Sequence, residues 1–399
     1  MNVLTLTEQI LRKMSGIGQV QFNFFSNLVY QWLSLRGRYT FENLRRQGFL
    51  NAMSYRRHFE QPFNFALFNH LLIEQYGSDE KVIVFDPSYI SKSGKHTDGL
   101  GRFWSGCAKS LKWGLEIAAI GISDVKNHTA FHYQAASTIL ADGQSQMDFY
   151  ISLLESYSTD LKKLSKYIVV DAFFAKISFI NAMLNVDLQV ITRLRDDAAL
   201  WYLYKGEKRK GRGRPTKYDG KIIPKNLNEN HFALVEQTPK HKAYEAVVFS
   251  KTFKKTLKVL IVQNIQAEEN IKNCKIFAST DITLSGLKIW QYYKVRFQQE
   301  FLFRDGKQFT GLNHCQSRKK ERLAFQFNFS LTILSIAKVV HWLSIPSGNR
   351  PAFSIQDIKT QYFNEHLLNK FILGLGICPQ TVKNSDNYRN LINYSKIAA

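Results

Sequence analysis

The run from Trp290 to Lys307 contains the side chains best suited to chemistry. It reads WQYYKVRFQQEFLFRDGK and carries Tyr293, Arg296, Glu300 and Lys307 in the spacing Y-x2-R-x3-E-x6-K. On a regular helix, at about 100° per residue, these four side chains fall within an arc of roughly 60°. One helix face therefore presents a carboxylate flanked by cations. The simpler interpretation is an ordinary amphipathic helix with a solvated Arg/Glu pair.

The same helix also has an apolar face. Trp290, Phe297 and Phe301 fall within roughly 40° of one another on a helical wheel, so we expect this face to dock on a core. Gly306 is a candidate helix end, and a helix that ended there would leave Lys307 on a loop.

Two aspartates follow predicted strands. KVIVFD, ending at Asp86, and YIVVD, ending at Asp171, are short runs that are apolar on both faces, which is typical of central strands between layers of helices. We expect each strand to stop at its aspartate. Because the carboxyl ends of parallel strands meet at one edge of a sheet, Asp86 and Asp171 should lie together there.

Asp86, Asp171 and Glu300 together offer three carboxylates, which are the ligands that hard cations prefer. Three carboxylates are enough to hold two Mg²⁺ ions, with Mn²⁺ as a substitute, at the roughly 3.5–4 Å separation used to cleave phosphodiesters. Arg296 and Lys307 would stabilise the charge that develops on the phosphate, and Tyr293 would contact a neighbouring phosphate.

Other interpretations of these acids and of the histidines are weaker. An aspartate after a strand is commonly a turn residue or helix cap. Asp281, in FASTD, competes for the role of third carboxylate, but it is expected to be the N-cap of the helix leading to Glu300. His128 and His132 are spaced HxxxH, yet no glutamate lies between them and they fall on a predicted strand. A zinc protease site is therefore not indicated.

The composition favours a polyanionic partner. Lys and Arg outnumber Asp and Glu by 54 to 32, which gives a net charge of +22 and an isoelectric point near 9.7. Nucleic acid fits this charge better than an anionic membrane, because no apolar run approaches twenty residues and the N-terminus is polar. We expect a cytoplasmic location. The four cysteines are far apart in the sequence, so they indicate neither a zinc site nor a disulfide framework.

The chain divides into five predicted segments. Residues 1–79 have helical periodicity throughout and form a helical domain. Residues 80–195 and 279–344 form the two parts of an α/β domain, in which a mixed sheet is flanked by helices. A β-rich insertion, 196–278, lies between them, and 345–399 add a helical segment that is a candidate for dimerisation.

The N-terminal helices have helix-turn-helix spacing. Thr40 can cap a helix TFENLRRQ, Gly48 ends it, and FLNAMSYRRHF follows at once. We expect the second helix to expose side chains suited to DNA, although helix pairs joined at glycine are common. These side chains are Asn51, Ser54, Tyr55, Arg56 and Arg57.

The insertion begins with a basic segment, KGEKRKGRGRPTK, which is punctuated by glycine and so is expected to be a solvated loop. It suits contact with a phosphate backbone, or it is a soluble linker without a partner. Its candidate DNA contacts are Arg209, Lys210, Arg212 and Arg214.

The Y-R-E-K signature, the blocks FDPSYISKSGK and VVDAFF around Asp86 and Asp171, and the stretch VITRLRDDAALWYLY…GRGRPTKY together resemble the DDE transposases of the Insertion Sequence 4 family. The resemblance covers about residues 80 to 340. It implies an RNase H-like catalytic domain interrupted by a mainly β insertion, Mg²⁺ dependence, cut-and-paste movement, and a dimer on DNA; members of the family can pass through a hairpin end. Asp86, Asp171 and Glu300 match the catalytic triad, and Tyr293, Arg296 and Lys307 match the DNA-backbone positions.

The resemblance also implies a tryptophan that stacks on a flipped base, for which Trp201 and Trp290 are both candidates. The resulting hypothesis is a DNA transposase that acts on the terminal inverted repeats of an insertion sequence and on target DNA. Two alternatives remain: an RNase H-like nuclease without strand transfer, and a non-catalytic DNA-binding regulator. None of them calls for an organic cofactor.

Overall fold

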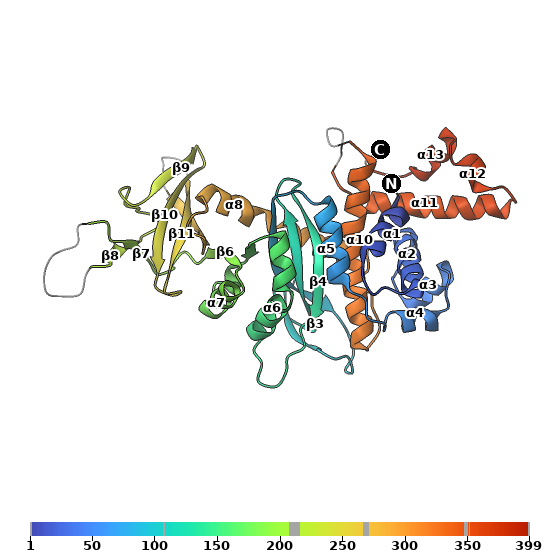
Figure 1. The fold of residues 1–399 in the computed structure, drawn as a ribbon, viewed down its shortest axis with the longest axis horizontal. Coiled ribbons are helices and arrows are strands. Elements are labelled where there is room, and N and C mark those ends of the chain that lie inside the picture. The colour runs from blue at the N-terminus through green and yellow to red at the C-terminus, as the bar shows by residue number, and fades with distance from the viewer. Residues whose placement is uncertain are drawn as a thin grey trace.

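The structure is a computed structural model that describes residues 2–106, 108–206, 216–265, 271–346, 350 and 352–397. The molecule is elongated (Figure 1): helices gather at one end, a sheet with helices on both faces occupies the middle, and a β-rich lobe lies at the other end. This mixed α/β architecture, with twelve described strands in one open sheet, agrees with the predicted fold class.

The first segment is helical, as predicted, and its helices begin at polar caps. Thr40 accepts the Asn43 N–H at the start of α3, and Asn51 does the same for the Ser54 N–H at the start of α4. The helices are α1 (Val3–Lys13), α2 (Gln19–Ser34), α3 (Phe41–Gln47), α4 (Ala52–His58) and α5 (Phe65–Tyr76).

One predicted side chain of α4 does not face solvent. Tyr55 is fully buried, and its hydroxyl donates to Gln31 Oε1 of α2 at 2.5 Å. The prediction that Tyr55 is available to DNA was therefore wrong: this aromatic ring joins α4 to α2, whereas Arg57 is exposed on the other side of the helix.

The central part of the sheet is mixed. β1 (Lys81–Ser91) is parallel to β5 (Tyr167–Val170), and β5 is parallel to β6 (Gln189–Leu194). On its other side β1 is antiparallel to β3 (Ser110–Asp124), which forms a hairpin with β4 (Thr129–Ser137).

Two details of this region differ from the predictions. β1 does not stop at Asp86 but continues through Pro87 to Ser91. Proline is tolerated there because β5 pairs with β1 only at Ile83 and Val84, so the β1 edge beyond them needs no N–H donor on that side. Between β1 and β3 the structure also contains a short strand that was not predicted, β2 (Gly101–Ser105), which pairs with β3.

Helices cover both faces of the sheet (Figure 1). α6 (Gln146–Leu164), the short 3₁₀ helix η1 (Ala172–Phe174) and α7 (Ile177–Asn185) lie on one side. α5 and α10 (Lys320–Ser344) cover the other side. α10 is long and apolar enough to cross a membrane by length and composition, but 94% of its most apolar stretch is buried inside the protein, as predicted for a core helix.

The segment predicted as an insertion is rich in strands, and these extend the central sheet rather than forming a separate one. Its β12 pairs with β6 and with β11. The strands are β7 (Leu200–Leu203), β8 (Tyr218–Lys221), β9 (Ala233–Thr238), β10 (His241–Ser250), β11 (Lys255–Ile265) and β12 (Ile271–Ser279). The basic residues Arg209, Lys210, Arg212 and Arg214 lie outside the described residues.

The last segments are helical. α8 (Gly286–Val295) and α9 (Gln298–Phe309) precede α10, and α11 (Ile355–Gly374), α12 (Pro379–Val382) and α13 (Asp386–Ile392) form the C-terminal arm beside the N-terminal helices (Figure 1). Large apolar side chains of this arm are exposed, among them Phe371 at 64% and Ile397 at 80%.

Candidate active site

Asp86 and Asp171 lie on neighbouring parallel strands at the same level. β1 and β5 are in register at Val84 and Val169, and both aspartates follow two residues later. Continuing that register places them side by side on strands about 4.8 Å apart. Asp171 is also the N-cap of η1, where its Oδ1 accepts the Phe173 N–H at 2.9 Å.

The signature residues lie on two helices rather than on the single regular helix that the spacing predicted. α8 ends at Val295 and α9 begins at Gln298. Between them the Arg296 N–H donates to Tyr293 O and the Phe297 N–H to Lys294 O, both at 3.3 Å, which are the tighter i→i−3 bonds of a 3₁₀ turn. This turn rotates the signature residues away from the arc expected for a regular helix.

The docking face of these helices was also predicted wrongly. Phe297 is 50% exposed, whereas Val295, Leu302 and Phe303 are buried. Gly306 does not end the helix, and Lys307 stays within α9. The buried face therefore lies one helix position away from the aromatic stripe that the sequence suggested.

The Arg296 guanidinium lies between two of the candidate carboxylates. Its Nη2 donates to Glu300 Oε1 at 2.8 Å, and its Nη1 lies 3.7 Å from Asp86 Oδ2. The Arg296 and Asp86 side chains are 13% and 19% exposed, while Glu300 is 41% exposed. Arg296 thus joins Asp86 of the strand to Glu300 of the helix, and the 3₁₀ turn is what directs it there.

The negative charges of the site act on Asp86 together. The pKa of Asp86 is raised to about 7, chiefly by burial; Arg296 opposes the rise, and Asp171, Glu300 and Glu116 add to it. Arg296 itself is held charged: burial disfavours the cation, but Asp86 and the other acids raise its pKa. The site therefore contains more negative charge than its own arginine neutralises.

Glu116 is a carboxylate of this site that the sequence argument missed. It is buried on β3, and its Oε1 accepts hydrogen bonds from Tyr150 at 2.6 Å, Gln146 at 2.8 Å and Thr138 at 2.9 Å. It lines a cavity of about 620 Å³ together with Asp86 and Asp171. A lone glutamate within the apolar run WGLEIAAIG was the signal that could have identified it.

Tyr293 and Lys307 stand on either side of this group. The Tyr293 ring packs on Phe277, and Arg296 lies 5.8 Å from the ring centroid. Lys307 Nζ donates to Ser88 Oγ at 2.8 Å. Ser88 lies two residues beyond Asp86 on the same strand, so it shares the strand face of Asp86.

The donor chemistry suits a hard divalent cation, since it offers only carboxylate oxygens in a buried site with excess negative charge. Across the residues that the structure describes, no three His, Cys, Asp or Glu side chains already converge to hold one ion. Arg296 accounts for this, because it holds Glu300 at 2.8 Å. Glu300 is exposed enough to change rotamer, so the residues fit a cation once that ion pair opens.

The other predicted residues are not brought to this site. Arg56 and Arg57 lie on α4, where Arg56 pairs with Glu42 at 3.3 Å. Asp281 accepts the Thr283 N–H and pairs with Lys166, whereas the N-cap of α8 is Ser285. The expectation that Asp281 caps that helix was therefore wrong.

The two candidate tryptophans lie in different surroundings. Trp201 is on β7 next to Tyr218. Trp290 is on α8, where the Lys294 ammonium lies 3.3 Å from its ring centroid. Both are half-buried, so exposure does not distinguish them.

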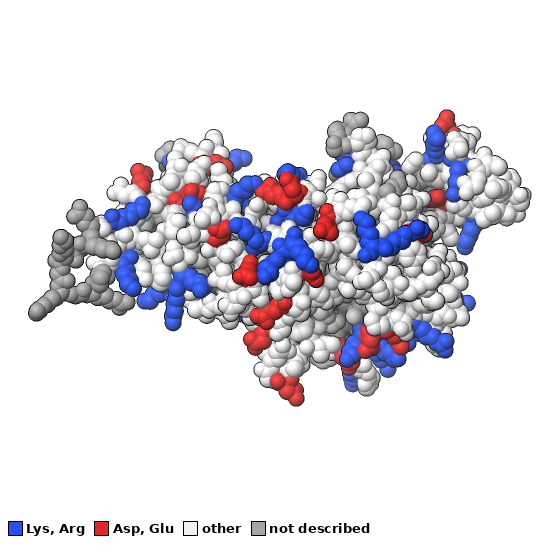
Figure 2. Space-filling view, viewed as in Figure 1, with Lys and Arg blue, Asp and Glu red and all other residues white. Residues whose placement is uncertain are grey.

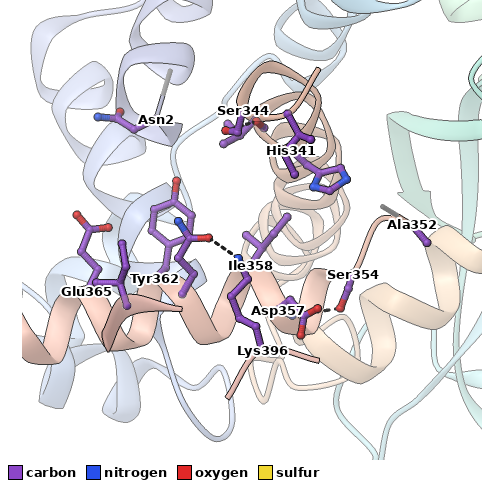
Figure 3. Close-up of a pocket in the computed structure, with 14 residues that line it drawn as sticks. Asn2, His341, Ser344, Ala352, Ser354, Asp357, Ile358, Tyr362, Glu365 and Lys396 are labelled. Carbon is purple, nitrogen blue, oxygen red and sulfur yellow. Dashed lines mark hydrogen bonds between the residues drawn. The ribbon is translucent and has the colours of Figure 1, made fainter. Parts of the chain in front are cut away.

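A second cavity, of about 490 Å³, lies far from the carboxylates between α10 and α11 (Figure 3). Its polar groups hold the C-terminal segment in place: Lys396 Nζ donates to Gln361 Oε1 at 3.1 Å, and the Ile397 N–H donates to Asp357 Oδ1 at 3.0 Å. These contacts attach the C-terminal segment to α11, and they offer no arrangement of groups for catalysis.

Basic side chains are spread over the molecular surface and are not confined to the predicted DNA-binding segments. On the face in Figure 2, lysines and arginines cross the middle of the molecule, where acidic side chains are interspersed among them. Some basic side chains of the described residues form ion pairs, including Lys126 with Asp79 at 2.6 Å and Lys288 with Glu80.

Comparison with known families identifies one match. The family model described as "Transposase DDE domain" matches residues 122–336, more than half of the chain. The matched residues include Asp171 and Glu300 and begin after Asp86. A search of curated proteins finds no match to the chain.

Proposed function

The chain belongs to the transposase DDE domain family, and from this premise we propose that it is a cut-and-paste transposase of the Insertion Sequence 4 type. It would cleave DNA at the terminal inverted repeats of its element and join the freed ends to target DNA. Family membership makes it an enzyme that acts on DNA. The observation that carries the finer proposal is the convergence of Asp86 and Asp171 on one sheet edge with Arg296 linking Asp86 to Glu300.

In this proposal Asp86, Asp171 and Glu300 hold Mg²⁺ or Mn²⁺. A bound pair of such ions lowers the pKa of the attacking water or 3'-hydroxyl and stabilises the leaving oxygen. The chain's own residues supply the setting. Asp86 and Asp171 are fixed by the strand register and the η1 cap, whereas Glu300, which is 41% exposed and paired with Arg296, would be the adjustable ligand of the cation.

Arg296 then becomes available to the DNA. Its guanidinium is buried against the carboxylates and has a planar fork that suits a phosphate. Lys307, held near Asp86 through Ser88, adds a second positive charge on the same side. Both charges lie where negative charge develops on a phosphodiester during substitution at phosphorus.

The domain division and the dimer are also proposals. Residues 1–79 are proposed to bind DNA, 196–278 to act as an insertion between the two parts of the catalytic domain (80–195 and 279–344), and 345–399 to dimerise. The exposed apolar side chains of the C-terminal arm support the last of these, because contiguous exposed apolar surface commonly marks an interface.

The deciding experiment uses duplexes taken from the DNA on both sides of the gene. The full chain is incubated with uncut and with pre-cut ends, a target plasmid, and either Mg²⁺ or EDTA. We expect cleavage of the uncut end and joining of the pre-cut end only with Mg²⁺. Cleavage without joining would identify a nuclease, and binding in EDTA with no cleavage under any condition would identify a regulator.

A further inference from the structure

A pocket of about 660 Å³ lies where β1 ends, formed by three segments that are distant in the sequence. One is the loop that follows β1, another is the loop between α9 and α10, and the third is the turn before α3. We name it the basic pocket, and its cationic side chains are Arg38, Lys92, Lys95 and Arg318, accompanied by His96 and His314.

The basic pocket contains no acidic side chain in its lining. Asp98 is in the same loop as Lys95 but does not line it. Within the described part of the chain no ion pair involves Arg38, Lys95 or Arg318, although all three are exposed.

Burial and neighbouring cations together lower the pKa of two groups in the pocket wall. The pKa of Lys92 is lowered, first by burial and also by Arg318, despite an opposing effect of Cys315. The pKa of His314 is lowered by burial and by the cations Arg38 and Lys359. Cations that repel one another in this way gain most from an anion that lies between them.

The pocket is held together by hydrogen bonds inside its walls. Lys92 Nζ donates to the carbonyls of Cys315 at 2.8 Å and Ser317 at 2.7 Å, which ties the loop after β1 to the loop before α10. The Tyr39 N–H donates to His314 Nδ1 at 3.3 Å and adds the third segment. Lys92 is thus a positioning residue, and Lys95, Arg38 and Arg318 are the charges that it places around the opening.

The basic pocket has a fixed relation to the carboxylate site, because β1 carries both. Asp86 lies near the middle of β1, and Ser91, at its end, lines the pocket. Five residues of strand span roughly 17 Å. Over that length one strand of B-DNA advances by about five phosphates, at 3.4 Å each along the axis.

We propose that the basic pocket holds the phosphodiester backbone of the DNA about five nucleotides from the bond cleaved at the carboxylate site. The inference rests on the proposed function, since it takes the carboxylate site as the place of cleavage. It adds a backbone contact made by Arg38, Lys95 and Arg318, residues outside the Y-R-E-K signature and outside the N-terminal helices α3 and α4.

A polymer fits the pocket better than a small anion. The volume of about 660 Å³ is large for a phosphate ion, and the cations surround an opening rather than a closed cage. The pocket also shares Cys315, Gln316 and Arg318 with an adjoining cavity that reaches α3 and Arg56 of α4. The predicted DNA-binding helices α3 and α4 therefore adjoin the basic pocket.

The first test measures affinity and its dependence on salt. Lys95→Ala and Arg318→Ala are combined in the full chain, and binding of the end duplex is followed by fluorescence anisotropy in EDTA from 50 to 200 mM salt. We expect affinity to fall roughly tenfold or more, and the slope of log K against log salt to flatten by about 1.8, because two phosphate contacts are lost. Lys126→Ala with Lys163→Ala, two exposed and paired lysines, is the matched control and should change neither quantity.

The second test changes the DNA instead of the protein, so it does not depend on how a variant folds. A single uncharged methylphosphonate is moved along each strand. In the wild type we expect binding to weaken most when it stands about five nucleotides from the cleaved bond. In the double variant the same substitution should cause no further loss. Additive losses at every position would overturn the proposal, as would a double variant that binds like the control.

Two further outcomes are distinct. If inorganic phosphate at fixed ionic strength displaced the duplex from the wild type but not from the double variant, the pocket would be a small-anion site and the proposal would be wrong. If the wild type bound through the pocket but never cleaved any end, the proposed function would fail while the backbone contact stood. If the wild type cleaved normally and the double variant bound the duplex as the wild type does, the proposed function would stand and the backbone contact would be wrong.

Discussion

Two regions on one strand have opposite electrostatic designs. The carboxylate centre, which comprises Asp86, Asp171, Glu116 and Glu300, gathers acids around Arg296. The basic pocket, five residues further along β1, gathers cations with no acid in its lining. The carboxylate centre therefore favours bound cations and the basic pocket favours bound anions. This division is expected of an enzyme that cleaves a polyanion with metal ions. Because β1 carries both regions, it sets the distance between them.

Removing a carboxylate should have the largest effect on cleavage and is the strongest test of the difference between the two regions. Asp86→Asn or Glu300→Gln should lower Mg²⁺-dependent cleavage by at least about 10³-fold, since the ligands support several kcal/mol of transition-state stabilisation. Binding of the end duplex in EDTA should be nearly unchanged. Asp281→Asn is the control, because that carboxylate lies outside the centre, and it should cleave normally. Normal nicking by either variant would remove its residue from the proposed site.

Arg296 tests the centre from its positive side. Arg296→Ala should lower cleavage by roughly 10²-fold at pH 7, the size of effect seen when one preorganised charged donor is removed. Arg296 opposes the rise in the pKa of Asp86, so its loss should raise that pKa and move the pH profile of cleavage upward. Arg296→Lys should be intermediate because it keeps the charge without the planar fork.

The matched control for Arg296 is Lys294→Ala. Lys294 is exposed and lies over Trp290, so its removal should change neither the cleavage rate nor the pH profile. An Arg296→Ala protein that cleaves as fast as the wild type at pH 7, with an unshifted profile, would show that the arginine only fills space between the acids.

The excess of acidic side chains should also lower the stability of the fold, and the loss should grow as pH rises. The folded-state pKa of Asp86 is raised from 3.8 to about 7, so its contribution is fully present below pH 4 and is lost as pH rises through 7. In EDTA, Asp86→Asn should therefore be more stable than the wild type at pH 8, on the order of 2 kcal/mol, and the difference should shrink toward pH 4. Thermal unfolding at several pH values measures this.

Asp281 provides the opposite sign for comparison. Although burial opposes it, hydrogen bonds from Thr283, Tyr167 and Lys166 lower the pKa of Asp281. Its contribution is present above its unfolded-state pKa and is lost as pH falls. Asp281→Asn should thus be less stable than the wild type at pH 8. If Asp86→Asn and Asp281→Asn changed the stability at pH 8 in the same direction, burial and repulsion at Asp86 would not explain the effect of Asp86→Asn.

Much of the fold could be predicted because it depends on local pattern. The apolar runs before Asp86 and Asp171 identify buried strands, and caps such as Thr40 locate helix starts. The pairing of the two aspartates followed from placing their strands parallel, and the register in the structure agrees. What the pattern did not contain was the continuation of β1 past Pro87, since that depends on where β5 stops pairing.

The candidate site was less predictable in its details, because these arise from tertiary contacts. The four signature residues were placed on one regular helix, whereas the 3₁₀ turn at Arg296 directs the guanidinium to Asp86. Tyr55 has the amphipathic surface of a DNA-contacting residue but is buried against Gln31. Glu116 and the basic pocket have no local motif: their meaning comes from strands and loops that the chain brings together from distant positions.

The smallest predicted effect concerns Lys307, which lies between the two regions. Its ammonium contacts Ser88 on β1, beyond Asp86 and before the basic pocket, so it should contribute one phosphate contact rather than hold the site together. Lys307→Ala is expected to slow cleavage about tenfold and to flatten the salt dependence of binding by about 0.9, the value for one contact. A roughly tenfold loss of rate together with this change in salt slope would separate a backbone contact from a catalytic one.

Arg304→Ala is the control on the same helix, because Arg304 is exposed and pairs with Asp305 at 3.0 Å; it should behave as the wild type. Ser88→Ala probes the same contact from the strand and should produce a weaker version of the Lys307→Ala defect. If Lys307→Ala abolished cleavage while leaving the salt slope unchanged, the lysine would belong to the carboxylate centre. β1 would then lack a phosphate contact between its two regions.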